Sequence, residues 1–157
     1  MRLTICAVGR LGPAAPERHL IEDWCARCER TGRALGLGPV RVIEVDDRRA
    51  SGIAAEGAAL RRAMAPGAVR VVLDERGEML SSPALAERLA RWRDAGRAEA
   101  AFAIGGADGT DPGLRADADL LLSFGPMVWP HMLVRAMLAE QLYRAATILA
   151  GAPYHRA

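Results

Sequence analysis

The carboxyl end of the chain carries side chains whose chemistry a chain end rarely needs. In the closing segment PYHRA, Pro153 is followed by Tyr154, His155 and Arg156, which offer an aromatic ring, a titratable imidazole and a permanent cation. Chain ends usually fray, and small or polar residues suffice there. An imidazole moves protons near neutral pH and a guanidinium binds phosphate, so we expect this segment to serve a functional site.

Two glycine-bearing segments follow apolar runs of the kind that form buried strands. VLDERG carries Leu73 at the end of the first run, and AIGGADG places Gly105, Gly106 and Gly109 after the second. Glycines let a ligand approach the backbone and expose peptide groups for hydrogen bonding. Their G-G-x-x-G spacing matches neither the dinucleotide fingerprint nor the phosphate-binding loop of nucleoside triphosphatases. A tight structural turn is the alternative interpretation.

The segment SFGPMVWPH, residues 123–131, indicates a stiff loop that is not helical. Its two prolines and glycine leave peptide groups free, and its apolar side chains can form walls. A flat heteroaromatic ligand such as adenine suits this combination, because backbone groups can read its edge between apolar faces. Alternatively, the apolar residues of the segment are simply part of the core: Phe124, Met127, Val128 and Trp129.

The kind of cation in this chain excludes several enzyme classes. All 21 Lys+Arg positions are arginine. The chain therefore lacks the lysine of nucleoside triphosphatase loops, of pyridoxal phosphate enzymes and of protein kinases. No serine stands in a G-x-S-x-G motif, which leaves hydrolase chemistry without support. The net charge of +2 does not by itself indicate a nucleic-acid partner.

Three further patterns have ordinary structural explanations. Cys25 and Cys28 are spaced like metal ligands, but they lie within a helical pattern without a second pair, so we expect a buried helix face and no metal. DGTDPG lacks the ligand set of a calcium loop and favours a capped turn. Glu140 and Arg144 are spaced for an ion pair on a helix surface.

The elements that must position these segments alternate between strand and helix. Apolar patterning predicts strands at residues 2–8, 40–45 and 69–73, and within AAFAIGG and DLLLSFG. Helices are predicted at 17–35, from 51 or 52 to 64, at 82–95 with Ser82 as N-cap, briefly after Asp111, and from 130 to about 150. This order predicts an α/β fold with a mainly parallel sheet, in a single domain over residues 1–157.

The composition predicts a cytoplasmic protein. No apolar run reaches the roughly 18 residues that suggest a membrane span. The apolar run at the start is too short for a secretory signal and alternates like a strand. Three cysteines, an odd number, argue against a disulfide framework and for a reducing compartment.

Ligands of open α/β sheets bind beyond the carboxyl ends of the strands. The segments after Leu73, after the strand that ends near Gly105, and after Ser123 all follow strands. We therefore expect these three loops to converge on one ligand, whereas nothing local dictates where the tail lies.

Taken in order, these segments resemble the ribosomal RNA large subunit methyltransferase H family. The resemblance rests on VLDERG, IGGADG, the proline-containing loop, PHMLVRAMLAEQLYRA and terminal PYHR, and it spans essentially the whole chain from AVGR onward. The last two segments are the specific part. Members of this family are SPOUT-type enzymes that methylate N3 of a pseudouridine in 23S rRNA.

The resemblance implies a trefoil knot in the C-terminal half, S-adenosyl-L-methionine as methyl donor, and a homodimer. The loop after Ser123 reads Phe-Gly-Pro-Met-Val-Trp, where relatives vary in side chain, and recognition by backbone groups tolerates that variation. The positions that match the family's cofactor site are Leu73, Gly105, Phe124, Gly125, Pro126, Met127, Val128 and Trp129.

The resemblance also suggests a purpose for the tail. Attack by N3 requires its imide proton to leave, which a positioned base or an anion-stabilising cation assists. His155 can accept the proton, or it can instead bind or position RNA. Arg156 can hold a phosphate or the developing anion, and Tyr154 can stack on a base. Arg135 is a second candidate for phosphate binding, and His131 can orient the loop.

A monomer of this mild charge would grip RNA weakly. We expect a homodimer in which the tail or arginines of one subunit complete the site of the other, acting on a substrate presented within the assembled ribosome. Two alternatives remain: a non-catalytic RNA-associated α/β dimer, and a small nucleotide-binding oxidoreductase.

Overall fold

The computed structural model describes residues 1–46 and 52–155. The strands are β1 (Arg2–Val8), β2 (Val40–Val45), β3 (Val69–Met79), β4 (Glu99–Ile104) and β5 (Leu120–Ser123). The helices are α1 (Pro16–Gly32), α2 (Ile53–Ala63), α3 (Ser82–Asp94), α4 (Pro112–Ala116) and α5 (His131–Leu149), with a 3-10 turn, η1 (Arg33–Leu35), after α1.

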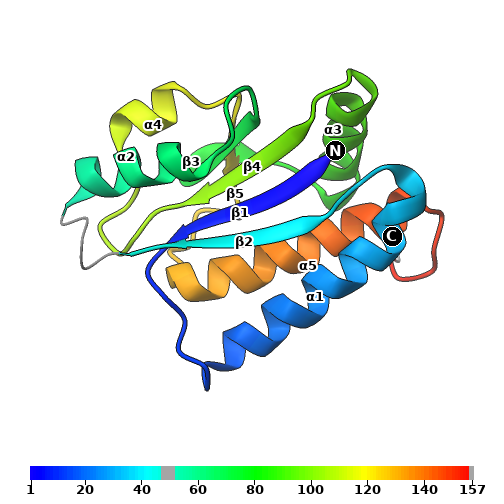
Figure 1. Cartoon of the computed structure of the whole chain (residues 1–157), viewed down its shortest axis with the longest axis horizontal. Coiled ribbons are helices and arrows are strands. Elements are labelled where there is room, and N and C mark those ends of the chain that lie inside the picture. Colours follow the sequence, from blue (N-terminus) through cyan, green and yellow to red (C-terminus); the bar gives the residue numbers. More distant parts are fainter. Residues whose placement is uncertain (47–51, 156–157) are drawn as a thin grey trace.

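The strands form one parallel sheet in the order β2-β1-β4-β3-β5. Helices α1 and α5 lie side by side on one face of the sheet, and α2 and α4 cover the other (Figure 1). Parallel strands need crossover connections, and helices supply most of them here. The predicted α/β class with a mainly parallel sheet is confirmed.

Two hydrophobic clusters, one on each face, follow from the alternation of side chains along the strands. In β1, Leu3, Ile5 and Ala7 face the cluster formed with α1, α3 and α5. Cys6 and Val8 point the other way, into the cluster formed with α2 and α4. A sheet that is covered on both faces requires near-continuous apolar strands, which is the pattern of β1, β3 and β4.

The structure corrects the prediction at two element ends. The N-cap of α3 is Ser81 rather than Ser82, because the Ser81 side chain accepts a hydrogen bond from the backbone N–H of Ala84 at 3.3 Å. Strand β3 does not end at Asp74 but continues to Met79. The expected turn is absorbed into a strand because both parts of β3 pair with β5.

The second half of β3 passes closely by β5. Leu122 is aligned with Leu73 and also with Glu78, so the residues between these two make an excursion from the regular ladder. Gly77 lies against β5 so tightly that an added Cβ would meet the backbone carbonyl of Leu121 at 2.7 Å. Close passage of one backbone past another requires a glycine at this position.

The two ends of α5 lie on opposite sides of the molecule. The helix begins near the carboxyl ends of the strands and runs back beneath the sheet, so that its last turn lies on the opposite side of the molecule, on the same side as the N-terminus (Figure 1). No helix in the described part of the chain is long and apolar enough to cross a membrane.

Candidate functional site

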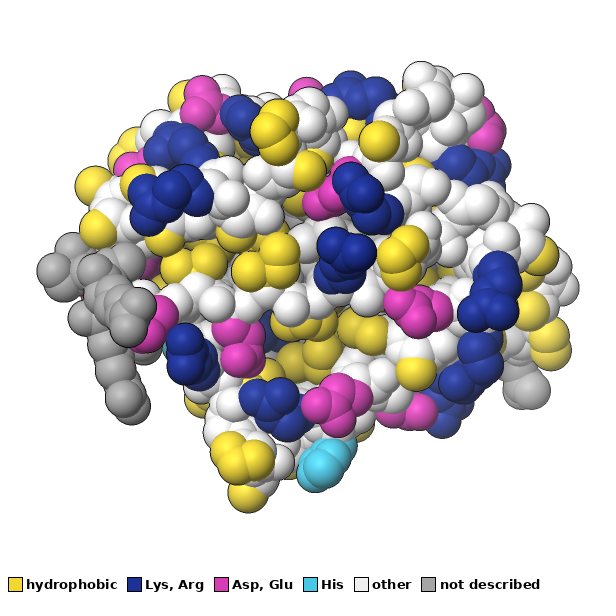
Figure 2. All heavy atoms as spheres, in the orientation of Figure 1, with side chains coloured by type: hydrophobic (Ala, Val, Ile, Leu, Met, Phe, Trp, Pro, Cys, Tyr) yellow, Lys and Arg dark blue, Asp and Glu magenta, His cyan; other side chains and the backbone are white. Residues whose placement is uncertain are grey.

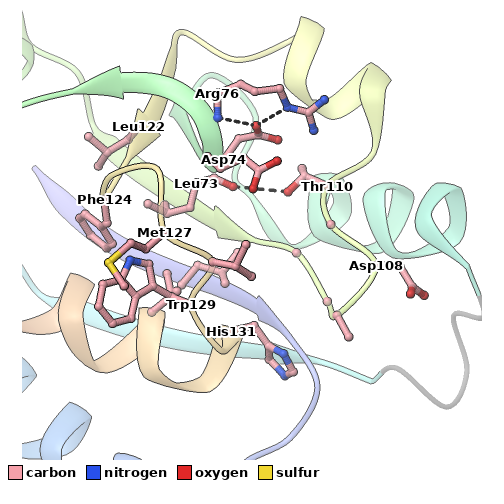
Figure 3. A pocket seen from close by; sticks show the side chains of 18 of the residues that line it. Leu73, Asp74, Arg76, Asp108, Thr110, Leu122, Phe124, Met127, Trp129 and His131 are labelled. Atoms are coloured by element: carbon pink, nitrogen blue, oxygen red, sulfur yellow. Dashed lines mark hydrogen bonds and ion pairs between the residues drawn. The ribbon is translucent and has the colours of Figure 1, made fainter.

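A cavity of about 340 Å³ lies at the carboxyl edge of the sheet. Residues 73–76, where β3 leaves the regular ladder, and the loops after β4 and β5 surround it (Figure 3). The three segments predicted to converge do so, although the first of them lies within β3 rather than after it. Among the predicted cofactor positions, Leu73, Gly105, Phe124, Gly125, Met127, Val128 and Trp129 line it. Pro126 is exposed and is not part of the lining. His131, at the start of α5, lines it as well.

The glycine segment forms both a tight turn and a wall of the cavity. Gly106 and Gly109 form an isolated antiparallel bridge. An added Cβ on Gly105 would meet the carbonyl oxygen of Gly109 at 2.5 Å, so no larger residue fits there without a shift of the backbone. The Thr110 hydroxyl donates to the Leu73 carbonyl at 3.4 Å and so joins this segment to the middle of β3. The two interpretations of this segment are therefore compatible.

The cavity has an apolar side and a polar side. Phe124, Met127 and Trp129 cluster on one side, while Asp74, Arg76 and Thr110 lie on the other (Figure 3). Met127 is 66% exposed, and its neighbour Val128 is 85% exposed. Exposed apolar side chains at the rim of a cavity are available to a ligand or partner rather than to the core.

Asp74 is the centre of an ion-pair cluster that the sequence analysis did not identify as functional. Its carboxylate accepts hydrogen bonds from the backbone N–H and Nε of Arg76, both at 3.0 Å, and from Nη1 of Arg115 at 3.3 Å. Burial acts to raise the pKa of Asp74, but these hydrogen bonds outweigh it and hold the pKa below its ordinary value. The sequence signal that could have identified Asp74 was an acidic residue directly after the apolar run predicted as a buried strand, residues 69–73.

Tyr154 and His155, the described part of the chemical side chains of the tail, do not close over the cavity of their own chain. Tyr154 and His155 lie near the opposite end of α5, where the Tyr154 hydroxyl donates to Glu140 at 2.9 Å and Nη1 of Arg144 lies 3.4 Å from Nδ1 of His155. Burial of Tyr154 and its hydrogen bond to Glu140 raise the pKa of Tyr154 above its ordinary value, so the hydroxyl keeps its proton and remains a donor. Arg156 lies outside the described residues.

Arg135 is not a surface residue for phosphate, which corrects the prediction. Its side chain is fully buried. Nη2 donates to the carbonyl of Val8, and Nη1 lies 3.5 Å from Glu44. The guanidinium thus joins α5 to the ends of β1 and β2, because backbone carbonyls at these strand ends need a donor.

A second, larger groove of about 560 Å³ begins beside the cavity. The two share Leu122, Phe124 and Gly125 as common walls. The groove is also lined by residues of α1, α3 and α5, by the end of β3 with the residue after it, and by the end of β5: Leu20, Trp24, Met79, Leu80, Ser82, Leu85, Ser123, Leu133, Ala136, Met137, Glu140 and Gln141. It therefore connects the cavity rim to Glu140, which holds the tail.

The other sequence patterns are mainly structural. Cys28 is buried in α1, and burial raises the pKa of Cys25 to about 11 and that of Cys28 to about 12, so both are neutral thiols. Across residues 1–46 and 52–155, no group of three or more His, Cys, Asp or Glu side chains is arranged to hold a metal ion. The predicted Glu140–Arg144 ion pair is present, but it is only partly exposed and contacts the tail.

Known proteins resemble this chain in sequence and in fold. Residues 1–155 match the family model described as predicted SPOUT methyltransferase. The chain is 65% identical to the ribosomal RNA large subunit methyltransferase H of Ruegeria pomeroyi and 68% identical to that of Cereibacter sphaeroides, in each case over 99% of both chains. A probable methylase family protein from Haemophilus influenzae shares the fold, with 11% identity, a TM-score of 0.51, and coverage of 99% of this chain and 70% of that one.

Proposed function

The chain belongs to the SPOUT methyltransferases, in the ribosomal RNA large subunit methyltransferase H family, and we propose on that basis that it methylates ribosomal RNA with S-adenosyl-L-methionine as donor. The observation that carries the proposal is the cavity around which residues 73–76 of β3 and the loops after β4 and β5 meet. Its volume of about 340 Å³ falls within the usual range for small-molecule sites, roughly 300–1,000 Å³.

The lining of the cavity fits this donor. Phe124 and Trp129 offer aromatic faces to an adenine ring, and the glycines after β4 leave peptide groups accessible. Glu75 and Asp108 add carboxylates to the lining, which favours a cationic sulfonium over an anionic ligand. When bound, the donor supplies a methyl group whose bonding pair stays on sulfur, while the attacking nitrogen loses its proton and bonds the methyl carbon.

The proposed target is N3 of a pseudouridine in a stem-loop of 23S rRNA. Relatives at 65–68% identity carry the name of ribosomal RNA large subunit methyltransferases, which supports the RNA class, and the resemblance to their family supports the base and the atom. The face drawn in Figure 2 carries arginines interspersed with acidic side chains. The net charge of this chain is only +2, so it attracts RNA weakly. The assembled ribosome in the cytoplasm is therefore a better substrate than naked RNA, because it presents the target already folded.

We further propose a homodimer that completes each site. Helix α5 has 19 residues and so spans about 28 Å, which separates the tail from the cavity of its own chain. The groove between them is lined by the exposed apolar side chains of Leu20 and Met79. A two-fold partner seated on this groove would bring its tail toward the neighbouring cavity, since the surface of a two-fold interface is self-complementary.

The trefoil knot also belongs to the proposal. The resemblance to the family supports it, and the register shift between Leu73 and Glu78 shows that β3 leaves and rejoins the ladder with β5 in this part of the chain. The match of one family model to residues 1–155 supports a single domain.

The decisive experiment uses ribosomes from a strain that lacks this protein. The purified protein and isotopically labelled S-adenosyl-L-methionine are expected to label one pseudouridine of 23S rRNA at N3, located by nuclease digestion and mass spectrometry. Ribosomes from the parent strain, whose site is already methylated, serve as the control. Binding to ribosomes without methyl transfer would instead indicate a non-catalytic RNA-associated dimer. Calorimetric binding of flavin or nicotinamide in place of the sulfonium donor would indicate an oxidoreductase.

A further inference from the structure

Glu140 holds the tail at a defined place on α5. One of its carboxylate oxygens accepts the Tyr154 hydroxyl at 2.9 Å and Nε of Arg144 at 3.0 Å, and it also accepts Nη2 of Arg144. The Glu140 side chain is 19% exposed and that of Arg144 is 25% exposed, so water only partly screens these contacts. A residue on the helix thereby fixes a residue of the chain end.

Aromatic rings hold the same segment from the other side. The Tyr154 ring lies 4.7 Å from the ring of Tyr143 and 6.0 Å from that of Trp24, and the guanidinium of Arg144 lies over it at 4.7 Å. Tilted ring contacts and a cation over a ring each stabilise a docked aromatic side chain. The tail is therefore docked by several contacts at once, despite its position at the chain end.

Arg144 also determines the hydrogen-bonding state of His155. Its Nη1 lies 3.4 Å from Nδ1 of His155. A guanidinium has only donors, so Nδ1 must be the acceptor in this contact. In a neutral imidazole whose Nδ1 accepts, the proton resides on Nε2. The tautomer is assigned from this bond, and it makes Nε2 of His155 a hydrogen-bond donor.

We propose that Glu140 and Arg144 are positioning residues, and that they present His155 as an Nε2–H donor to the target base rather than as the base that removes its proton. This inference rests on the proposed methylation of a pseudouridine in a composite site. A donor aimed at a carbonyl oxygen beside N3 stabilises the negative charge that develops there. In that step the N3–H bond breaks and its proton goes to solvent water, and the electron pair left on N3 forms the bond to the methyl carbon.

Two substitutions of His155 separate the two roles. The amide of glutamine reaches the position of Nε2 and can donate, but an amide cannot take up a proton at neutral pH. The shorter His155→Asn variant places its amide near the position of Nδ1. We expect His155→Gln to keep activity within about tenfold of the unaltered protein and His155→Asn to lose about 10²-fold, because an ångström of misplacement has that effect. Equal loss of activity in both variants would overturn the donor role.

Glu140→Gln tests the positioning role, and the chain offers a matched control. Glu87 and Arg91 form an ion pair at the same i,i+4 spacing on α3, with Oε1 and Nη2 2.6 Å apart, and it is exposed. We expect Glu140→Gln to lower kcat by about 10²-fold while the Kd for S-adenosyl-L-methionine stays unchanged, and Glu87→Gln to change neither. A loss of donor affinity that matches the loss of kcat would contradict a positioning role.

A readout that does not depend on activity distinguishes failure of this inference from failure of the proposed function. The chain has only two tyrosines, so the proton resonances of the Tyr154 ring can be assigned. The tilted Tyr143 ring, 4.7 Å away, shifts these resonances. We expect Glu140→Gln to return them toward free-tyrosine values while Glu87→Gln leaves them in place. Unchanged resonances in Glu140→Gln would overturn the positioning role. If instead the resonances move but the unaltered protein methylates no ribosomal RNA, the proposed function fails, and with it the donor role of His155.

Discussion

Arg135 and Asp74 show how strongly the role of a charged side chain depends on its surroundings. In the sequence, Arg135 stands near the predicted ligand loop and is a reasonable candidate for phosphate. In the structure it is buried between α5 and the ends of β1 and β2, where it serves the Val8 carbonyl. Asp74 lines the cavity but is held by two arginines.

Replacement of Arg135 should affect stability more than RNA binding. Arg135→Met leaves the buried Val8 carbonyl without this donor, which costs about 1–3 kcal/mol of the free energy of unfolding. Arg41→Met, at an exposed position on β2, is the control and should stay within about 0.5 kcal/mol of the unaltered protein. Urea denaturation measures both. Equal stability of the two variants, with weaker ribosome binding only in Arg135→Met, would restore the phosphate-binding role.

The lowered pKa of Asp74 predicts that the stability of the protein falls at acidic pH. Because its pKa is lower in the folded protein than the ordinary value of 3.8, its contribution is complete above about pH 4. That contribution is lost as the pH falls through the lowered pKa. The unaltered protein should therefore be more stable than Asp74→Asn at pH 6, and thermal unfolding should show this difference shrinking toward pH 3. A difference that stays constant over this range would mean that the ion pairs with Arg76 and Arg115 add nothing.

The cavity could be predicted because its parts are local signals. Glycines after one strand and prolines after another mark the loops, and the general position of ligands in parallel sheets brings the loops together. The position of Tyr154 and His155 could not be predicted in this way. It depends on contacts with Glu140, Tyr143 and Arg144. Residue spacing in the sequence does not predict which side chains meet across the turn that follows α5.

At the scale of elements, most strands and helices follow from apolar period and capping residues. The exception is β3, whose continuation through Gly77 to Met79 depends on β5, a strand that comes more than 40 residues later in the chain. Pairing over such a separation is set by tertiary contacts rather than local propensity. The α3 cap differs by one residue because both Ser81 and Ser82 have a suitable side chain.

The close passage of β3 along β5 predicts that substitution of Gly77 destabilises the protein. In Gly77→Ala, the added Cβ would meet the Leu121 backbone at 2.7 Å, and overpacking of this kind costs about 1–3 kcal/mol. Donor binding should weaken as well, because neighbouring residues of the excursion line the cavity. Gly12→Ala has no atom within 4 Å of the added carbon and serves as the control. Chemical denaturation and calorimetry should separate the two variants, and identical behaviour would show that the close passage is not needed.

At the scale of the whole molecule, the distance between cavity and tail makes assembly part of the proposed chemistry. Each chain carries the proposed donor cavity at one end of α5 and the docked Tyr154 and His155 at the other, with an apolar groove between them. In a monomer with this arrangement, Tyr154 and His155 lie away from the cavity of their own chain. A two-fold dimer that buries the groove would supply that cavity with the tail of the partner.

A charge in the groove should therefore abolish activity without unfolding the chain. Leu20→Glu places a carboxylate at a position that is 47% exposed, so the monomer tolerates it while an apolar interface does not. Val42→Glu, at an exposed apolar position on the edge strand β2 that does not line the groove, is the control. Analytical ultracentrifugation should find monomers only for Leu20→Glu. This variant should remain folded in the absence of the donor, and its methylation activity should be lost. Full activity from a strictly monomeric variant would refute the composite site.

The most direct test of the composite site is the activity of a purified heterodimer of two inactive chains. One chain carries Phe124→Ala and Trp129→Ala and is shown by calorimetry to bind no donor, and the other carries His155→Ala and Arg156→Ala. If each cavity uses the tail of the partner, one of the two sites contains both intact parts, and the heterodimer should show about half the activity of the unaltered dimer. If each cavity uses its own tail, both sites are defective, and a heterodimer without activity would contradict this account.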